Sequence, residues 1–217
     1  MVTSSDLGAL RREYGDAGLD DPDLAADPVT MFQAWFEDTV SSGLHEPNAM
    51  VLSTVSAAGA PSSRLVLLKG LDERGFVFYS NSESRKGREL AENSRCTLLF
   101  PWHDLQRQVR VDGRAEEVEP ELTEAYFDSR PRESQIGAWA SHQSSEVASR
   151  AELEEAYAEV ERRFEGAVVP VPPHWGGVRV RPEEVEFWQG RKGRMHDRLV
   201  YRRENSEPGW TTVRLAP

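Results

Sequence analysis

The chain has 217 residues, and 37 acidic against 26 basic side chains give it a net charge of −11. A surface of that sign repels a phosphate backbone, which excludes general binding to nucleic acid. No apolar run approaches the roughly 20 residues that cross a bilayer, and the first residues contain no apolar segment of a secretion signal. We therefore expect a cytoplasmic protein without membrane contacts. The single cysteine excludes an internal disulfide and zinc sites that need two or more cysteines.

The first predicted helix follows residues 1–26, an acidic stretch poor in apolar residues that we interpret as a mobile N-terminal arm. Asp27 before a proline is typical of a helix start, and Gly43 of a helix end. Four apolar residues recur between them at helical spacing and are expected to be buried: Phe32, Trp35, Phe36 and Val40.

Short strands joined by tight turns make up most of the rest of the chain. We predict strands over residues 49–55, 63–71, 76–80, 95–102, 107–118, 178–190, 196–204 and 210–217. A short helix capped by Ser82 is expected over 82–94. Residues 120–165 are expected to be helical in pieces, with breaks at Pro131 and near Gly137 and the strongest helical pattern over 146–164.

This order of elements favours an α+β fold, an antiparallel β-barrel with helices packed outside it. There is no alternating strand–helix–strand series and no GxGxxG, so a dinucleotide-binding domain is not expected. The GxxxxGK[ST] phosphate loop is also absent. Residues 27–217 are predicted to form a single domain.

The first candidate site is the segment SRLVLLKG, residues 63–70, an apolar strand with a cation near each end. Strand parity places Arg64 and Lys69 on opposite faces, so they are expected to reach two different anions, or one anion at the end of the strand. Two charges at the edges of a core strand are the ordinary structural alternative, which the spacing alone favours.

A second candidate is the predicted first turn Ser84, Arg85 and Lys86. Cations are mildly unfavourable at a helix N-terminus, whereas an anion is bound well there by free N–H groups and the helix dipole. A phosphate would satisfy the serine and both cations together. A solvated basic turn explains the same residues equally well.

Two further segments carry possible anion ligands. Tyr126, Arg130 and Ser134 recur at helical spacing, although Pro131 interrupts the helix and ordinary surface charges explain them too. If 194–201 is a strand, Arg194, His196 and Arg198 share a face, which needs either solvent or an electron-rich ligand.

Other kinds of site find no support. The five histidines lack metal-ligand spacing, so no metal site is predicted. Cys96 lies in a predicted buried strand, which is typical of an inert thiol. There is no GxSxG elbow to anchor a hydrolase triad.

Taken in order, these segments resemble the pyridoxine (pyridoxamine) 5′-phosphate oxidase family. The matching stretches are LRREY, RLVLLK, FYS, SRK, LLFPWH, RQV, YFDSRPRESQIGAWAS, HQSS, PPHWGG, EFWQG, RMHDR and RLAP. They run from residue 10 to the C-terminus, and their order makes the match specific. The resemblance implies an FMN-binding split β-barrel and a homodimer with active sites at the subunit interface.

The resemblance also implies roles for individual residues. The FMN-binding set would be Arg64, Leu65, Val66, Leu67, Leu68, Lys69, Tyr79, Ser80, Ser84, Arg85, Lys86, Gln108, Gln143, Ser144, Trp188 and Arg198, with Gln143 and Ser144 supplied by the partner subunit. The substrate-binding set would be Arg11, Tyr14, Lys69, Tyr126, Arg130, Ser134, Arg194 and His196. Arg194 and His196 would be the catalytic pair at the pyridine ring, and residues 11–14 would close over the site as a lid.

Two positions depart from the family pattern without losing function. Met195 replaces a common leucine and is expected by parity to face away from the site, and Ser80 keeps the hydroxyl of a common threonine. The implied reaction oxidises pyridoxine 5′-phosphate or pyridoxamine 5′-phosphate to pyridoxal 5′-phosphate with O2, giving H2O2 and, from the amine, NH3. The alternatives are another split-barrel flavin reductase, a non-catalytic carrier of pyridoxal 5′-phosphate, and an acidic structural protein.

Overall fold

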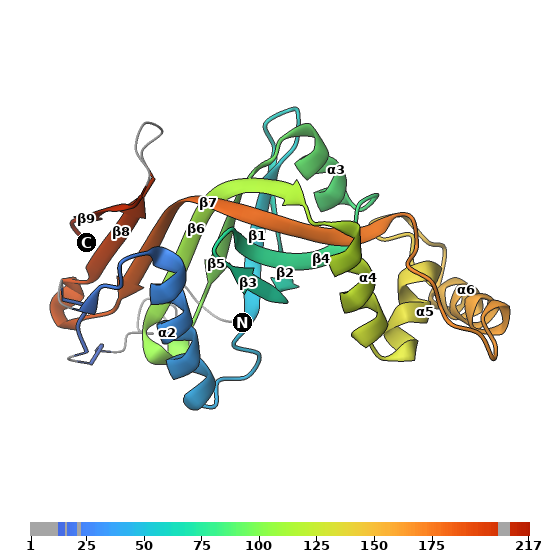
Figure 1. The fold of residues 1–217 in the computed structure, drawn as a ribbon, viewed down its shortest axis with the longest axis horizontal. Helices are drawn as coiled ribbons and strands as arrows, with labels where there is room; N and C mark the ends of the chain where they lie inside the picture. Colours follow the sequence, from blue (N-terminus) through green and yellow to red (C-terminus); the bar gives the residue numbers. More distant parts are fainter. Residues whose placement is uncertain (1–12, 16, 21–22, 204–208) are drawn as a thin grey trace, which may run out of the picture. The chain divides into compact units, whose positions relative to one another are not determined.

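The computed structural model of the chain describes residues 13–15, 17–20, 23–203 and 209–217. Its strands form one sheet in the order β2-β1-β5-β6-β7-β4-β3, with β8 paired to β7 and β9 to β8 (Figure 1). The pairs β1–β2, β3–β4, β4–β7, β7–β8 and β8–β9 are all antiparallel. The predicted antiparallel α+β fold is confirmed.

The chain folds into two compact units. The first comprises Met1–Pro47, Leu99–Val111 and Glu184–Pro217, and the second comprises Asn48–Leu98 and Asp112–Glu183. Three strands pass from one unit to the other: β5 (Arg95–Phe100), β6 (Arg107–Glu117) and β7 (Trp175–Gln189).

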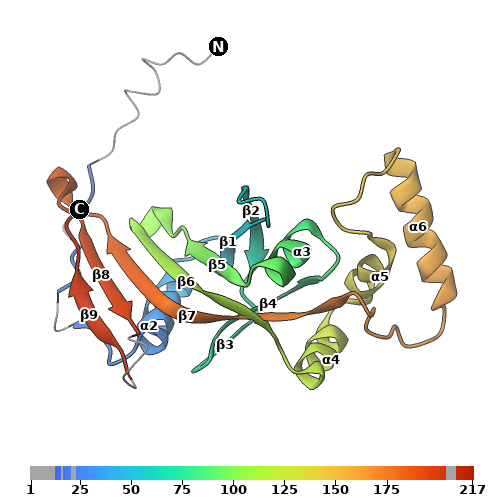
Figure 2. The same cartoon turned by 90° about the horizontal axis from the view of Figure 1, so that it is seen from above.

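The first unit packs the helix α2 (Pro28–Ser41) on aromatic residues of its strands. The Phe32 ring lies 4.7 Å from that of Phe100, and the Trp35 ring lies 5.2 Å from that of Phe187. The unit also contains β8 (Asp197–Arg202) and β9 (Thr211–Arg214), which lie side by side in Figure 2. Its two short 3-10 turns are η2 (His103–Leu105) and η3 (Lys192–Arg194).

The ends of α2 agree with the sequence, whereas one of its buried residues does not. Asp27 accepts hydrogen bonds from the backbone N–H groups of Val29 and Thr30, and Gly43 has a positive φ of 76° just past the helix end. The expectation that Val40 is buried is wrong, because its side chain is 52% exposed and Thr39 lies inside instead.

The strands of the second unit are β1 (Ala49–Val55), β2 (Pro61–Leu67), β3 (Gly70–Asp72) and β4 (Gly75–Asn81). A single strand over residues 63–71 is therefore wrong. The chain changes partner there, because β2 pairs with β1 and β3 pairs with β4. Lys69 lies at this change of partner, between the two strands, where its N–H donates to the Val77 carbonyl at 2.8 Å.

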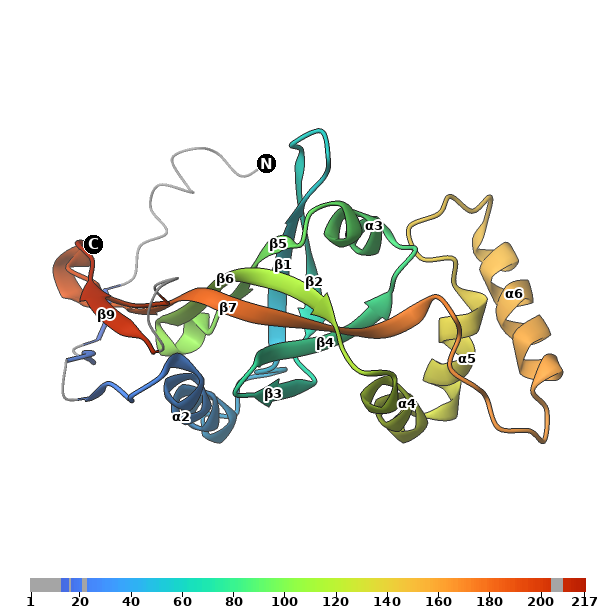
Figure 3. The same ribbon diagram turned by 45° about the horizontal axis from the view of Figure 1, so that its top comes forward.

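The helices of the second unit are α3 (Arg85–Glu92), α4 (Pro120–Ser129), α5 (Arg132–Ala140) and α6 (Arg150–Arg163). Figure 3 shows α5 beside α6. A small core of Phe127, Ile136, Phe164 and Val169 lies among these elements. Tyr157 and Val160 pack against that core as predicted, but Leu153 is exposed.

Three predicted helix boundaries need correction, and one is confirmed. Ser84 caps α3 rather than Ser82, because the Ser84 Oγ accepts from the Gly87 N–H. The helix expected from residue 146 begins only after its cap at Ser149. Gly137 does not interrupt the chain and lies inside α5, whereas the break at Pro131 is confirmed.

Replacing Asp27 with alanine should lower the free energy of unfolding by about 1 kcal/mol, the usual cost of losing an N-cap. Burial raises the pKa of Asp27, but the hydrogen bonds from Thr30 and Val29 outweigh it and lower the pKa overall. The stabilisation by the charged form is therefore present above the ordinary carboxyl pKa and is lost as the pH falls through the lowered value. Urea denaturation at several pH values measures both effects.

Asp27→Asn is the matched control, because asparagine caps helices about as well as aspartate and does not titrate. It should stay within a few tenths of a kcal/mol of the unchanged protein. An Asp27→Ala protein with an unaltered urea midpoint would contradict the assigned cap.

Candidate functional site

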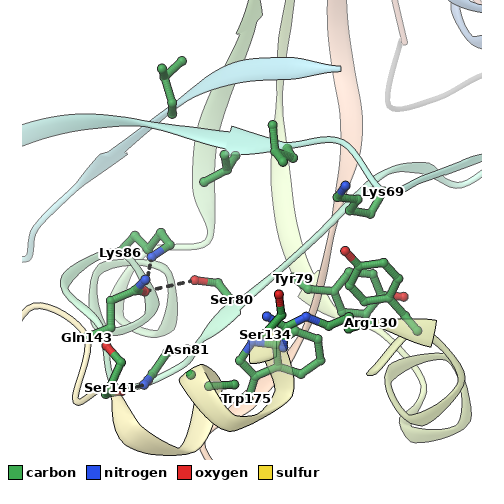
Figure 4. A pocket seen from close by; sticks show the side chains of 16 residues that line it. Lys69, Tyr79, Ser80, Asn81, Lys86, Arg130, Ser134, Ser141, Gln143 and Trp175 are labelled. Atoms are coloured by element: carbon green, nitrogen blue, oxygen red, sulfur yellow. Dashed lines mark hydrogen bonds between the residues drawn. The ribbon is translucent and has the colours of Figure 1, made fainter. Parts of the chain in front are cut away.

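The second unit contains a cavity of about 480 Å³ between its strands and helices α3 to α5. Many of the residues singled out from the sequence line it, namely Leu65, Val66, Leu67, Lys69, Tyr79, Ser80, Lys86, Tyr126, Arg130, Ser134 and Gln143. Figure 4 shows Lys86 and Gln143 on one side of the cavity and Lys69 with Arg130 on the other. The cavity is large enough for an organic ligand of cofactor size.

One wall of the cavity is the strand β2. Leu65, Val66 and Leu67 all line it although side chains alternate between the faces of a strand, so the backbone edge of β2 must contribute. In the strand order β2 has a neighbour on one side only, β1. Backbone N–H and C=O groups of an edge strand can pair with a ligand.

At one end of the cavity, the Lys86 ammonium projects from the first turn of α3. Its Nζ donates to the Gln143 Oε1 at 2.6 Å and to the Ser84 Oγ at 3.2 Å. The Ser80 hydroxyl donates to the same Gln143 oxygen at 3.5 Å. Gln143 makes these contacts within one chain, which differs from the implied supply of Gln143 by a partner subunit.

Lys86 is a buried cation with neutral partners. Burial, and next the positive charge of Arg64, lower the pKa of Lys86 to about 8. A cation held this way gains energy from any anion that enters the cavity.

At the other end, Tyr126, Arg130 and Ser134 meet at the junction of α4 and α5. They do not lie on one continuous helix: Arg130 has extended backbone, with ψ 147°, as expected for the residue before a proline. The Gln135 side chain donates to the Phe127 carbonyl at 2.9 Å across this junction. The kink still places all three side chains on the cavity wall.

Arg130 has unused hydrogen-bonding capacity. Its guanidinium carbon lies 4.8 Å from the centre of the Trp175 ring. Its Nη1 is buried and has no hydrogen-bond partner among the described residues. Burial lowers the pKa of Arg130, so an anion here would stabilise its charged form.

Three aromatic rings form the floor beside these cations. The rings of Tyr79 and Tyr126 are stacked with centres 3.9 Å apart, and the ring of Trp175 is stacked 5.4 Å from that of Tyr79. Gly177 permits this arrangement, because a Cβ there would lie 2.8 Å from the Tyr79 Cε1. Burial raises the pKa values of Tyr79 and Tyr126, so both hydroxyls remain protonated hydrogen-bond donors at neutral pH.

Acidic side chains are absent from the lining of this cavity. Lys69, Lys86 and Arg130 have no ion pair among the contacts of the described residues. Most other arginines of the described chain do pair with carboxylates, as in Arg74–Glu119 and Arg198–Glu186. In a chain of net charge −11, a cavity with three cations and no carboxylate is suited to an anionic ligand.

Several predicted residues of the second unit do not line the cavity. They are Arg64, Leu68, Ser84, Arg85 and Ser144. The Ser84 hydroxyl is fully buried and used by the protein, since it donates to the Asn81 carbonyl and accepts from Gly87 and Lys86. Leu68 is buried, and Ser144 has a positive φ of 72°.

A second group of predicted residues lies in the first unit. The His196 ring is 4.6 Å from that of Trp188 and 5.3 Å from that of Tyr14. Gly190 leaves room for Tyr14, because a Cβ there would lie 3.1 Å from the Tyr14 ring. The Arg191 N–H donates to the His196 Nδ1 at 3.1 Å, so the neutral ring carries its proton on Nε2.

The remaining predicted residues differ from expectation in their surroundings. Arg194 belongs to η3 and Met195 follows it, so the parity argument across 194–198 is wrong: β8 begins only at Asp197. Met195 is 68% exposed. Arg198 forms a two-pronged pair with the buried Glu186, at 2.8 and 3.1 Å.

Two predicted residues complete the list. Gln108 lies in β6 within the first unit and is partly buried. Arg11 lies outside the described residues.

The structure adds cavity residues that the sequence reasoning missed: Asn81, Gly137, Ala138, Ser141 and Trp175. Asn81 and Ser141 meet at 3.5 Å between the Asn81 Nδ2 and the Ser141 carbonyl. Trp175 stands in the segment PPHWGG, which the family resemblance already includes. The glycine pair after this tryptophan was the available signal, because it permits a ring to lie against the backbone.

Two other kinds of site were searched for within the described residues. No group of three or more His, Cys, Asp or Glu side chains there could hold a metal ion. None of the described helices is both long and apolar enough to span a membrane.

Known proteins resemble the chain over nearly all of its length. A family model described as pyridoxamine 5′-phosphate oxidase matches residues 36–189, and one described as the pyridoxine 5′-phosphate oxidase C-terminal dimerisation region matches 175–217. Proteins named pyridoxine/pyridoxamine 5′-phosphate oxidase from Rubrobacter xylanophilus and a Nocardioides species are 58% and 61% identical over 212 residues. The alignments cover 98% of this chain and 97% and 98% of those proteins.

A solved structure has the same fold. PhzG from Burkholderia lata, in complex with tetrahydrophenazine-1-carboxylic acid, superposes with a TM-score of 0.86 at 32% identity, covering 93% of this chain and 99% of PhzG. The predicted antiparallel split barrel with peripheral helices is thereby confirmed.

The lowered pKa of Lys86 can be measured directly. The chain has three lysines, at positions 69, 86 and 192, so a protein labelled with ¹³C at the lysine side chains should give three ε-carbon signals. One of them should titrate near the pKa of about 8 given for Lys86, below the ordinary value of 10.5. NMR spectra recorded from pH 6 to pH 11 measure the titration.

Lys86→Arg identifies the Lys86 signal by its loss and keeps a positive charge in the cavity. If no lysine signal titrates between about pH 7 and pH 9, the side chain is better solvated than the structure indicates.

Proposed function

Because the chain belongs to the pyridoxamine 5′-phosphate oxidase family, we propose that it is an FMN-dependent oxidase of phosphorylated vitamin B6. It would convert pyridoxine 5′-phosphate or pyridoxamine 5′-phosphate to pyridoxal 5′-phosphate. O2 would accept the two electrons and two protons to give H2O2, and the amine substrate would also release NH3 after hydrolysis.

The observation that carries this proposal is the row of unpaired cations in the cavity. Lys86 lies at one side and Lys69 with Arg130 at the other (Figure 4), and no acidic residue neutralises them. The proposed reaction brings together two phosphate groups, one on FMN and one on the substrate. Each would be met by positive charge on its own side of the cavity.

The residues fit FMN in three respects. Lys86 offers a buried ammonium for the phosphate, Gln143 and Ser80 offer polar groups beside it, and the edge of β2 offers backbone groups to a flat ring. Arg64 and Arg85 would add charge at the phosphate, and Gln108, Trp188 and Arg198 would complete the set that the family resemblance implies. When bound, FMN supplies the redox chemistry by accepting a hydride from the 4′ carbon.

The substrate phosphate would be held by Lys69, Tyr126, Arg130 and Ser134. The unpartnered Nη1 of Arg130 would donate to a phosphate oxygen, and Tyr126 and Ser134 each carry a hydroxyl donor. Anchoring the phosphate orients the reacting carbon, which is the protein's main contribution when the cofactor performs the chemistry.

Residues of the first unit would act at the pyridine ring. His196, with its proton on Nε2, would donate a hydrogen bond to a ring substituent, and Arg194 would cover the ring. Tyr14 already contacts His196 and, with Arg11, would belong to the segment that closes over the substrate. The match of residues 175–217 to a dimerisation region supports a homodimer, and we propose that its active sites lie at the subunit interface.

The likeness to PhzG raises a second candidate, oxidation of a tricyclic carboxylic acid. The PhzG ligand carries one carboxylate, a single negative charge, whereas a phosphate ester carries close to two at neutral pH. Lys69 and Arg130 together match the doubly charged group better. The two candidates are separated by testing both substrates.

Purified protein should be incubated in air with FMN and pyridoxine 5′-phosphate, following aldehyde and peroxide together. Equal yields are expected. Arg130→Ala should weaken substrate binding by about 1.5–3 kcal/mol, roughly 10- to 150-fold, because it removes a charged hydrogen bond. Binding of FMN, measured by quenching of its fluorescence, should be retained.

Arg132→Ala is the matched control. It removes the same charge two residues further on, but the Arg132 guanidinium donates to the carbonyls of Phe164 and Ala167 and does not line the cavity. Aldehyde without peroxide would indicate a reductase with another electron acceptor. Binding of pyridoxal 5′-phosphate without FMN would indicate a carrier, and turnover of the tricyclic acid alone would favour the second candidate.

A further inference from the structure

Glu89, on α3, is a buried carboxylate beside the cavity. Only 4% of its surface is exposed. Its Oε1 accepts from the Arg85 Nε at 2.8 Å, and its Oε2 accepts from the Ser62 hydroxyl at 2.6 Å and lies 3.4 Å from the Arg64 Nη2. The Thr54 hydroxyl also donates to Oε2. Figure 3 shows α3 lying beside the β1–β2 hairpin, which supplies three of these four partners.

Glu89 is ionised in the folded protein. Burial raises its pKa, but the hydrogen bonds from Ser62, Thr54 and Arg85 outweigh burial and bring the pKa to about 2. A buried carboxylate is retained at this cost only when its partners are well placed. Both of its oxygens are engaged, one toward each arginine.

The order of charges in α3 opposes the stability of the helix itself. Arg85 and Lys86 occupy its first turn, which contains no acidic residue, and Glu89 follows four residues after Arg85. A helix is stabilised by the reverse order, with the carboxylate nearer its N-terminus. Rules of local stability are broken in this way where a site needs a particular arrangement of charge.

The two arginines held by Glu89 keep different capacities for a ligand. The Arg64 terminal nitrogens also donate to the Leu52 carbonyl, Thr54 and Ser62, so its guanidinium has one fixed orientation. The Arg85 side chain is 56% exposed and is tied to Glu89 through Nε. The other Arg85 nitrogens make no described hydrogen bond and remain available to an anion.

We propose that Glu89 is a positioning residue for the FMN phosphate: it holds the guanidinium groups of Arg64 and Arg85 in place next to Lys86. The inference rests on the proposed function, which assigns these three cations to FMN. Three cations and one carboxylate leave two positive charges, which match a phosphate dianion. Without Glu89 the cations would repel one another and lose their fixed orientation.

The test compares FMN with riboflavin, which has the same ring and no phosphate. Glu89→Gln keeps the size of the side chain and removes its charge. We expect the dissociation constant of FMN to rise about tenfold or more, as for the loss of a charge-assisted hydrogen bond. The dissociation constant of riboflavin should stay within about twofold, because no charged group of riboflavin meets the arginines. Fluorescence quenching measures both constants without turnover.

Glu92→Gln is the matched control, because it makes the same change three residues further along α3. Glu92 is exposed, and its carboxylate accepts only the Ala57 N–H, at 3.2 Å, among the described contacts. Glu89→Asp keeps the charge on a shorter side chain and should recover part of the FMN affinity. It also serves as the test variant if Glu89→Gln does not fold, as judged by circular dichroism, and then a weaker FMN affinity with unchanged riboflavin affinity is expected.

The outcomes separate the two levels of proposal. Equal weakening for FMN and riboflavin would make Glu89 a purely structural residue, and tighter FMN binding would make it a competitor of the phosphate; either result overturns the inference. If the unchanged protein binds FMN no better than riboflavin, the phosphate site itself is wrong, and with it the proposed function.

Discussion

Positive charge without a carboxylate partner is the feature on which the candidate site depends. Lys86 and Arg130 are desolvated and their pKa values are lowered, so the folded protein bears an electrostatic cost at each. The chain has ample acidic residues to pair with them, and pairs most of its other described arginines. A ligand with phosphate groups would supply the missing negative charge, and its binding energy would include relief of that cost.

The fold keeps these cations apart on one cavity wall by placing each at the end of an element. Lys69 follows β2 where the chain changes pairing partner, Lys86 lies in the first turn of α3, and Arg130 lies at the kink before Pro131. Ends of elements have backbone that the sheet or helix does not consume, so side chains there can point into a cavity. Regular structure between them provides the stiffness that keeps the distances between cations constant.

The sequence predicted what depends on local rules. The cap at Asp27, the break at Pro131 and most strands follow from nearest-neighbour chemistry, and the structure agrees with them. Ser82 and Ser84 are both possible caps by composition, and only the tertiary bonds of Ser82 to His174 decide between them. The face shared by Arg194 and Arg198 failed for a similar reason, because the turn η3 ends before β8 and parity does not carry across it.

The candidate site shows the same division. Periodicity brought Tyr126, Arg130 and Ser134 together although the helix is broken between them, because the pre-proline kink preserves their common side. Residues that act through packing, such as Trp175 and Gly177, carry no charge pattern that spacing could reveal. Glu89 was hidden for another reason: a single glutamate in an acidic chain is unremarkable until its burial is known.

Charge in this protein is organised in layers, and the order of the layers follows from solvation. Cations that face the cavity have neutral partners, as Lys86 has with Gln143 and Ser84. Arg64, behind the cavity, shares the buried carboxylate of Glu89. A carboxylate placed in the cavity itself would neutralise the cations and compete with a phosphate, whereas one placed behind them orients the arginines and limits their mutual repulsion. Selection for anion binding therefore acts on where the acidic residues lie as much as on the cations themselves.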